Sequence, residues 1–545
     1  MTLFLLIFTI SFFLLSIRRL DWALMLLFFL LPSYLVRFNF IIPMTMLEVM
    51  ILIVFLVGYI KNFRQIFRNL KNKLKIENCK LKIDSDYPFK WEMIFLLVIS
   101  FAAVGVAGIT NEALGIWKAY FFEPLLLYIV VVNVFGRPTP PLLRATSQGA
   151  DYSPPLQGGV GDLSAEALAK EEIRGGVSKI IWPLALSALA VSLFAIYQKF
   201  TGQFISNPLW AAEATRRVTS IFGYPNAVGL YVESIIFLSL GFLLAVIARN
   251  GVTRQSQVDL NKQEFSKNNI DSNQSEILTP GAKATFRNDK IKIGALLLSI
   301  IFSVLAIVFA KSVGAVLGVA AGLIVFLLLY GKKVRLVTLA IIIITSIGIV
   351  SYQPLRHQAL KYVTLNDFSG QVRKSQWKET WQMLSDSKII TGVGLSGYQK
   401  AVAPFHVPGI FVKDFDDPDA QRKLVFNEAY RNAHWQPLEI YLYPHNIFLN
   451  FWTELGLLGM ALFIWVIAKF FYLGFKQLNC VIPANAGIHA SGKNEFIVSA
   501  LISAMTAIVV HGLVDVPYFK NDLAALFWLL MAMMSILYLE NKKEV

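Results

Sequence analysis

The most regular feature of the chain is a series of apolar runs about 20 residues long, separated by polar or basic stretches. A helix of about 20 residues crosses the ~30 Å of hydrocarbon in a bilayer. A membrane β-barrel would instead give segments of about ten residues with alternating polarity, and the chain does not have that pattern. We therefore predict an all-α fold, a polytopic transmembrane helical bundle. The predicted spans are residues 1–17, 21–36, 40–60, 91–109, 117–135, 180–199, 225–247, 292–311, 313–330, 334–352, 446–473, 496–514 and 521–539.

Composition supports a membrane protein. Of the 545 residues, 56% are hydrophobic and 16% are charged, whereas soluble domains have about 25% charged residues. The net charge is +15, which in a soluble protein would suggest nucleic acid. In a membrane protein it follows from the Lys and Arg that cytoplasmic loops retain. We expect membrane lipids, and no nucleic acid, around this chain.

Basic connectors set the predicted orientation. The stretch 61–82 is dense in Lys and Arg and is expected to be cytoplasmic. Counting spans from it places the polar segments 200–224 and 353–445 on the outer face. Residues 1–17 lack the features of a signal peptide and are interpreted as a span. If they do not cross fully, twelve spans remain and the N-terminus is inside, and the sequence leaves both topologies open.

The same pattern divides the chain into five parts. These are N-terminal transmembrane helices at 1–135, a cytoplasmic insertion at 136–179, central transmembrane helices at 180–352 with a cytoplasmic loop at 248–290, an extracytoplasmic loop at 353–445 and C-terminal transmembrane helices at 446–545.

Three cytoplasmic stretches are predicted to be disordered. Residues 136–179 are rich in Pro, Gly and Ser, residues 248–290 are polar and rich in Asn, Gln and Ser, and the stretch around 481–495 lacks apolar periodicity. Within the first, only LSAEALAKEEIR favours a helix, which Gly175-Gly176 should stop. Cys79 and Cys480 also fall in predicted cytoplasmic connectors, so we expect neither a disulfide nor a thiolate metal site.

The strongest candidate for chemistry is YPHNIFLNFWTELGLLG, residues 443–459. Pro444 favours a helix start, which places His445 at the outer mouth of the span 446–473. Backbone N–H groups at a helix start attract anions. The same dipole lowers the pKa of an imidazole and keeps it neutral, as a general base must be. The alternative is a histidine that anchors the helix at the membrane interface.

Glu454 lies nine residues after His445, on the opposite face of a regular helix. It is therefore not expected to orient His445. A carboxylate inside a span usually faces protein or a polar cavity, and Gly456 with Gly459 marks a face where another helix can approach. We interpret Glu454 as a structural partner of a neighbouring helix.

Basic side chains also occur at predicted outer positions, where the positive-inside bias disfavours them. Arg216 and Arg217 precede the span 225–247, Lys311 with Ser312 sits at a hairpin between two spans, and Arg373 lies one helical turn from Trp377. Guanidinium groups bind phosphate oxygens bidentately. The alternatives are lipid-headgroup contacts and an ordinary interface helix with a snorkelling base.

His511 and Asp515 are spaced i, i+4 at the outer end of a span and could touch, which favours a structural ion pair or hydrogen bond. The chain has no H-E-x-x-H motif and no Walker A loop, and residues 413–421 lack the Gly and terminal Glu of a calcium loop. We predict no metal and no cofactor.

The segment HNIFLNFWTELGLLG, residues 445–459, resembles the hallmark of the O-antigen ligase and polymerase family. Further pieces resemble that family in the same order: Arg217 with Ser220, Phe222, Pro225 and Asn226; Ser312 to Ala315; Arg373 with Trp377; Thr391 to Leu395; and Asp515. Together they span roughly residues 214–530, whereas the N-terminal third is similar only in hydropathy. One departure is Val313, where the family often has Arg. Lys311 is the nearby charge, but it is a point charge and not a bidentate fork.

The resemblance implies a GT-C-like membrane glycosyltransferase of the bacterial plasma (inner) membrane. Such enzymes move a glycan from an undecaprenyl-diphosphate carrier to an acceptor hydroxyl on the outer face, inverting the anomeric centre without a metal. By resemblance, His445 would be catalytic, and Arg217 and Arg373 would hold the diphosphate. Further candidates are Arg216 and Lys311 at the diphosphate, and Asn446, Asn226, Ser312, Trp377, Glu454 and Asp515 in support. The acceptor, a glycan, lipid or protein hydroxyl, stays open.

A transporter of a small anion or lipid-linked sugar is the alternative function. It would place charges near the membrane midplane and show internal repeats. Here Glu48 and Glu454 fall within predicted spans, but the basic residues cluster at the outer rim and neither half repeats the other. This favours an enzyme. A structural scaffold would make the outer His and Arg residues dispensable.

Overall fold

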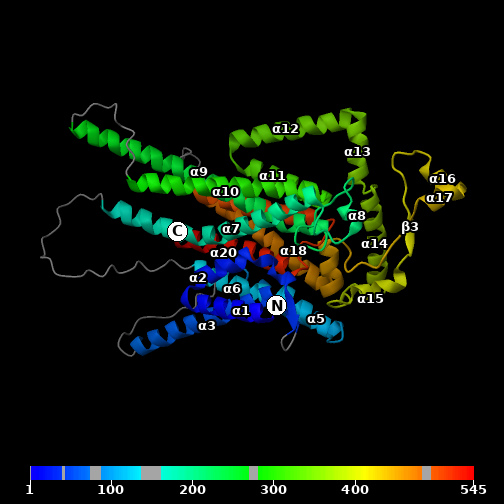
Figure 1. Ribbon diagram of the computed structural model, residues 1–545, viewed down its shortest axis with the longest axis horizontal. Helices are drawn as coiled ribbons and strands as arrows, with labels where there is room; N and C mark the ends of the chain where they lie inside the picture. The colour runs from blue at the N-terminus through cyan, green and yellow to red at the C-terminus, as the bar shows by residue number, and fades with distance from the viewer. Residues whose placement is uncertain are drawn as a thin grey trace.

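The computed structural model describes residues 2–39, 43–73, 87–136, 161–268, 280–481 and 492–544. These residues are almost entirely helical (Figure 1), which confirms the predicted all-α polytopic bundle. Each predicted span is formed mainly by one helix, although the span 21–36 ends in the 3-10 turn η1 Leu31–Leu35 and the span 117–135 begins in the π-helical turn η2 Trp117–Phe122. The main helices are α1 Thr2–Arg18, α2 Leu20–Phe29, α3 Met46–Lys73, α4 Lys90–Val106, α6 Glu123–Phe135, α7 Gly161–Thr201, α9 Pro225–Asn268, α10 Pro280–Ala310, α11 Val313–Leu329, α12 Lys332–Ser351, α18 Ile447–Val481, α19 Gly492–Gly512 and α20 Asn521–Glu544.

Among the described residues, eight helical segments are long and apolar enough to cross a membrane. Three shorter apolar helices cover residues 3–18, 20–29 and 313–329. The chain is therefore a multi-pass membrane protein. The crossing of the other predicted spans, which correspond to α1, α2, α3, α4 and α11, stays a prediction. The choice between twelve and thirteen spans, which depends on α1, stays open with it.

The long helices lie side by side, and the segment that joins α12 to α18 gathers at one end of the bundle (Figure 1). We call this end, which carries His445, the His445 end. The joining segment contains α13 Gln353–Val363, α14 Phe368–Ser385, α15 Tyr398–Val402, η4 Ala403–Phe405, β3 Gly409–Phe411, α16 Ala420–Phe426, α17 Glu428–Ala433 and β4 Trp435–Pro437. Strands β3 and β4 pair antiparallel, with Ile410 opposite Gln436. The C-terminus lies at the other end of the bundle.

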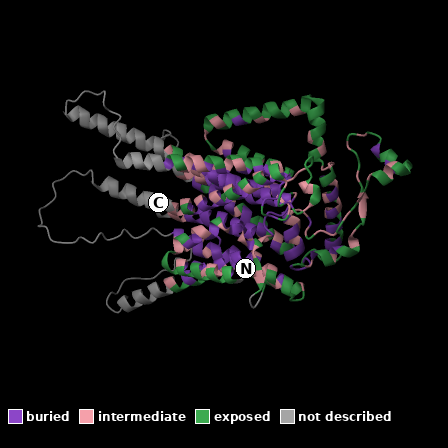
Figure 2. Ribbon diagram, in the orientation of Figure 1, coloured by how far each residue is buried: buried purple, intermediate pink, exposed green. Residues whose placement is uncertain are grey.

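Burial differs sharply between helices (Figure 2). In α20, 89% of the apolar membrane-spanning stretch is buried inside the protein, whereas in α12 only 6% of the corresponding stretch is buried. Around α20 the core is fixed by specific contacts such as the 2.8 Å hydrogen bond between Tyr128 and Ser535. In α12 the apolar side chains face away from the protein and suit lipid instead.

The prediction that residues 40–60 form one span is wrong at its start. A short hairpin precedes α3, formed by β1 Arg37–Asn39 and β2 Pro43–Thr45, while residues 40–42 lie outside the described residues. Thr45 and Glu48 then form a reciprocal capping box, with N–H to side-chain oxygen distances of 3.1 and 3.3 Å. Glu48 also pairs with Lys118 at 2.9 Å. It therefore lies at a helix start and not inside a span.

The predicted cytoplasmic disorder is also partly wrong, because helices extend into all three connectors. α7 begins at Gly161 and continues through Gly175-Gly176, while α9 reaches Asn268 and α18 reaches Val481. Gly176 does not stop the helix; instead its missing Cβ lets α7 pass close to the backbone of Phe135. Residues 137–160, 269–279 and 482–491, with Cys79 and the side chain of Cys480, lie outside the described part.

The remaining short elements cap the His445 end. They are η1 Leu31–Leu35, α5 Asn111–Ile116, the π-helical turn η2 Trp117–Phe122 and α8 Pro208–Ala211. In η2 the backbone carbonyl of Tyr120 accepts a hydrogen bond from the Tyr518 hydroxyl at 2.8 Å. This wider turn ties the N-terminal helices to the segment before α20.

Candidate functional site

His445 lies just before α18, in a backbone turn and not in the helix. Its φ is +47°, in the left-handed region. Asn446 is the N-cap, and its Oδ1 accepts the Leu449 N–H at 3.0 Å. The expectation that Pro444 opens the helix is therefore wrong. Its carbonyl instead accepts a 2.8 Å hydrogen bond from the Trp377 indole, which fixes the turn.

The His445 ring is held by α14 and by two tyrosines. Its Nδ1 lies 3.0 Å from Oε1 of Gln376, and the rings of Tyr441 and Tyr443 lie 5.2 Å away. Because the amide oxygen can only accept, Nδ1 carries the proton and Nε2 keeps a lone pair. Within the described residues no hydrogen bond occupies Nε2. The arrangement leaves a proton acceptor available on the ring.

The pKa of His445 is below its ordinary value. Burial is the main cause and the positive charge of Arg373 adds to it, while the carboxylate of Asp515 opposes both. The imidazole is therefore neutral at pH 7. This is the protonation state that the sequence led us to expect, but its physical cause is burial beside a cation.

Arg373 lies one turn before Gln376 and Trp377 on α14. One of its nitrogens donates to Ser369 at 2.8 Å. Its Nε is buried and has no hydrogen-bond partner among the described residues. Burial lowers the pKa of Arg373, with Asp515 opposing, yet an arginine stays charged. A buried guanidinium with an unused donor can bind an oxyanion.

Arg217 is linked to Asp515 through hydrogen bonds with Asn226. Its Nη2 donates to Asn226 at 3.2 Å, and Asn226 donates to Asp515 at 3.2 Å. Its Nε donates to the carbonyl of Ala310, at the end of α10, at 3.0 Å. Since Asp515 interacts electrostatically with both Arg373 and His445, the structure brings together residues from four separate segments of the chain.

Arg216, next to Arg217, lies differently. Its Nη1 donates to the carbonyl of Lys199 at 2.9 Å, and its Nε donates to that of Ala211 at 3.1 Å. The guanidinium packs against Gly202, which has a φ of +71° and no room for a side chain. Two of the three guanidinium nitrogens of Arg216, Nη1 and Nε, thus already donate to backbone carbonyls of α7 and α8.

Lys311 and Ser312 form the turn between α10 and α11. Lys311 is exposed, has a φ of +52° and donates weakly to the carbonyl of Thr215 at 3.4 Å. Ser312 is buried, and in the described part of the chain its hydroxyl has no hydrogen-bond partner. Both residues lie beside the segment that contains Arg217. In the described part of the chain, the hydrogen bond that links them to the Arg217 side chain is a weak one, from Arg217 Nη2 to the Lys311 carbonyl at 3.4 Å.

Glu454 lies beside a break in α18. Gly456 has φ 76° and ψ −178°, which interrupts the helix, so the assumption of a regular helix was wrong. The loop Thr391–Leu395 docks into this break, where Val393 donates to the Thr453 carbonyl at 2.7 Å and Leu457 donates to that of Ile390 at 3.1 Å. Glu454 accepts the Ser396 N–H at 2.7 Å. Its partner is thus a loop and not a neighbouring helix, and Gly456 receives that loop.

His511 also differs from the prediction. Its Nδ1 lies 2.8 Å from Oε2 of Glu233, and both side chains are almost fully buried. Asp515 instead donates its backbone N–H to the His511 carbonyl. The expected side-chain contact between His511 and Asp515 is therefore wrong. The imidazole packs against Gly314 of α11, where any side chain would clash.

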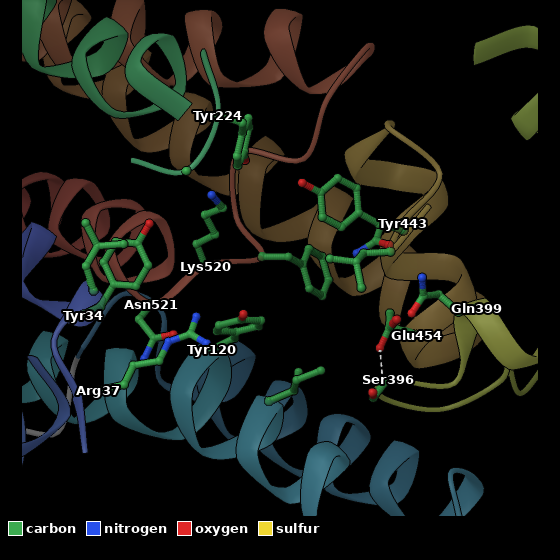
Figure 3. A pocket seen from close by; sticks show the side chains of 16 residues that line it. Tyr34, Arg37, Tyr120, Tyr224, Ser396, Gln399, Tyr443, Glu454, Lys520 and Asn521 are labelled. Atoms are coloured by element: carbon green, nitrogen blue, oxygen red, sulfur yellow. Dashed lines mark hydrogen bonds between the residues drawn. The ribbon is translucent and has the colours of Figure 1, made fainter. Parts of the chain in front are cut away.

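A pocket of about 420 Å³ adjoins the His445 turn (Figure 3). Two basic residues that line it, Arg37 and Lys520, are not among the residues predicted from sequence. Each lies at the outer end of a predicted span, so the positive-inside bias that singled out Arg217 would also have found them. Across the described residues, no group of three His, Cys, Asp or Glu side chains is placed to hold a metal, and we name no cofactor-binding residue.

A family model described as O-Antigen ligase matches residues 298–464. The match contains Arg373, Trp377, His445 and Glu454, whereas Arg217, Asn226 and Asp515 lie outside it. A search of curated proteins found no match. Residues 298–464 therefore carry a domain of the O-antigen ligase family, and this domain supports a membrane enzyme of that type.

Proposed function

We propose that this protein transfers a glycan from an undecaprenyl-diphosphate carrier to an acceptor hydroxyl. The observation that carries the proposal is the uncommitted Nε2 of His445, on a ring that is neutral and lies within electrostatic range of Arg373. A proton acceptor beside an unused cationic donor suits a reaction in which an alcohol attacks and a diphosphate leaves.

In this mechanism His445 acts as the general base. The acceptor oxygen attacks the anomeric carbon as Nε2 takes the hydroxyl proton, and the bond from that carbon to the diphosphate oxygen breaks. A hydroxyl is a weak nucleophile, and a base with a pKa near 7 can activate it. Gln376 holds Nδ1 protonated, which keeps the lone pair on the nitrogen that faces substrate.

The leaving diphosphate needs its negative charge stabilised. Arg373 offers its buried Nε, and Arg217 is oriented by Asn226 and Asp515. Preorganised donors of this kind stabilise developing charge at little cost in reorganisation. The diphosphate is an intrinsically good leaving group, so the reaction proceeds without a metal in this proposal.

Other residues of the site act by position. Asn446 and Trp377 hold the His445 turn, and Glu454 holds the loop Thr391–Leu395 against α18 through Ser396. Ser312 contributes packing at the start of α11. Arg216 and Lys311 have no role in this mechanism.

We assign the His445 end to the outer face of a bacterial plasma membrane. The basic stretch 61–82 is expected on the cytoplasmic side. Counting spans from it places the segments 200–224 and 353–445 on the opposite side, and both segments lie at the His445 end of the bundle (Figure 1). The carrier's tail would remain in the bilayer while its head group reaches the arginines. The N-terminal helices 1–135 then act as a scaffold for this end.

The test is His445→Ala in a strain that depends on this protein for its surface polysaccharide. We expect loss of long or attached glycan and accumulation of carrier-linked glycan at unchanged protein level, with the same result for Arg217→Ala. His357→Ala is the matched control, because His357 is an exposed histidine at the same end. Unchanged glycan in His445→Ala would reject the catalytic assignment. A changed ladder of chain lengths indicates a polymerase, and lost attachment of full-length glycan indicates a ligase.

A further inference from the structure

The pocket beside His445 contains two cationic side chains that the transfer chemistry does not use. Arg37 comes from the hairpin before α3, and Lys520 precedes α20. Figure 3 shows both on the same side of the pocket, with Lys520 below the ring of Tyr224. Segments from the two ends of the chain thus place two positive charges in one cavity.

Neither cation is neutralised by a direct partner. In the described part of the chain, Arg37 and Lys520 form no ion pair and donate no side-chain hydrogen bond, and Lys520 instead lies 3.9 Å from the Tyr224 ring centroid. Burial lowers the pKa of Lys520 and Arg37 lowers it further, while Asp522 and Asp515 oppose this. The lining also contains one carboxylate, Glu454, which lies beside Ser396 and across the pocket from the two cations (Figure 3). Two like charges on one side of a cavity favour an anionic ligand between them.

The walls of the pocket suit a sugar. Four tyrosines line it, Tyr34, Tyr120, Tyr224 and Tyr443, and such rings combine an apolar face with a polar edge. Amide groups add hydrogen-bonding capacity. Gln399 donates from its amide nitrogen to the Ile440 carbonyl, and Asn521 donates from its amide nitrogen to Glu48. Within the described residues, neither amide oxygen accepts a hydrogen bond, so both can accept one from a sugar hydroxyl. The volume of about 420 Å³ lies within the usual range for small-ligand sites.

The pocket also adjoins the proposed base. Tyr443 lines it, and the Tyr443 ring lies 5.2 Å from that of His445. Arg37 and Lys520 belong to different segments from Arg217 and Arg373. A glycan bound in this pocket would therefore lie beside His445, while Arg217 and Arg373 remain available to bind the diphosphate of the carrier.

We propose that this pocket binds the acceptor through an acidic sugar, whose carboxylate or phosphate lies between Arg37 and Lys520. The acceptor role depends on the proposed function, whereas the selective binding of an acidic sugar does not. The acceptor is thereby assigned to a chemical class, an anionic glycan.

The test measures binding to the full-length protein in lipid nanodiscs by calorimetry. The probes are cellobiose, its 6′-carboxylate and its 6′-phosphate, which differ only in charge and in the group that carries it. We expect at least one acidic probe to bind tenfold or more tightly than cellobiose. Arg37→Gln and Lys520→Gln should each remove most of that difference, and Lys520→Arg should retain it. Equal binding of all three probes, or discrimination that survives both Gln substitutions, would overturn the proposal.

A second titration separates the acceptor from the carrier. Undecaprenyl diphosphate should bind Arg37→Gln and Lys520→Gln as tightly as the unsubstituted protein, and Arg373→Ala at least tenfold more weakly. If the pocket variants lose carrier binding instead, the pocket holds the carrier's diphosphate and the acceptor assignment is overturned. If acidic probes are preferred but His445→Ala leaves glycan transfer intact, the proposed function fails and the acidic-sugar site stands.

Discussion

Two histidines at the same end of the bundle have opposite surroundings. His511 is almost fully buried, packs against Gly314 and pairs with Glu233 at 2.8 Å. His445 is partly buried in a turn outside the helices, held at Nδ1 by a neutral amide with Nε2 unoccupied. A histidine paired with a buried carboxylate stabilises the fold, whereas a histidine that keeps a lone pair beside a cavity can accept a proton from a substrate.

The comparison shows why residue type alone does not identify a base. Both histidines fall at the outer ends of predicted spans, and both have Asp515 in electrostatic range. The difference lies in the surroundings of the imidazole, because that of His511 pairs with a buried carboxylate, whereas that of His445 bonds to a neutral amide beside a pocket. Substitutions around His511 should therefore affect mainly stability, and substitutions around His445 should affect mainly transfer.

The largest effect is expected from His511→Ala, which leaves the Glu233 carboxylate without its partner. Breaking a buried ion pair from one side typically costs about 3–5 kcal/mol, so the free energy of unfolding and the yield in mild detergent should fall. His511→Ala/Glu233→Gln should recover part of the loss. Thermal unfolding of the purified protein measures this, with His445→Ala as the matched variant that should melt normally. Normal melting of His511→Ala together with lost transfer would place His511 in the chemistry.

Gln376→Leu should leave the fold intact but disturb the base. The Leu side chain cannot accept a hydrogen bond from the His445 Nδ1–H, so the ring loses its fixed tautomer and orientation. A misplaced catalytic group costs about 10²-fold in rate. Transfer kinetics on purified protein measure the loss, and Gln376→Asn is the control with a shorter amide. Full activity in Gln376→Leu would show that Gln376 does not position His445.

Gly456→Ala tests the break in α18 that supports the site. A residue with a side chain is disfavoured at φ +76°, and its Cβ would clash with the Ile390 carbonyl. Strain of this kind costs about 1–3 kcal/mol, measured by thermal unfolding. The matched control is Gly348→Ala in α12, where nothing lies within 4 Å of an added Cβ. Equal behaviour of the two variants would argue against a rigid docking of residues 390–396.

The smallest effect is a shift in pH dependence for Asp515→Asn. Transfer needs a neutral His445 and is lost as the pH falls through its pKa. Asp515 raises that pKa, so its removal should move the acid limb of the rate profile to lower pH, by less than about one unit. Profiles normalised to their maximum separate this from any weakening of Arg217. A shift to higher pH would contradict the assigned direction.

Hydropathy predicted the location of every long helix, because burial in lipid selects for long apolar runs. It failed where local chemistry sets the boundary. Thr45 and Glu48 start α3 through their capping box, and Asn446 starts α18 although Pro444 looked like the opener. At Gly456 a regular helix was assumed because a glycine inside an apolar run does not reveal its φ.

The site was only partly predictable from sequence. His445, Arg217, Arg373 and Asp515 are conspicuous charges or bases at predicted span ends, and the structure brings them together. Gln376 has no such signal, because a glutamine on an amphipathic helix is ordinary. Its importance arises only when α14 folds against residues 443–446. Arg37 and Lys520 stand out as basic residues at outer span ends, but no local pattern shows that they meet in one pocket from opposite ends of the chain.

The isolation of α12 has a consequence for how different parts of this chain can change over time. Only 6% of its apolar stretch is buried inside the protein. Its side chains therefore contact mostly acyl chains, which accommodate any apolar shape. α20 is 89% buried and must fit neighbours of fixed outline. Related chains should therefore drift freely in the order of Leu, Ile and Val along α12, while the equivalent of α20 should change mainly through paired substitutions with its neighbours, above all α6.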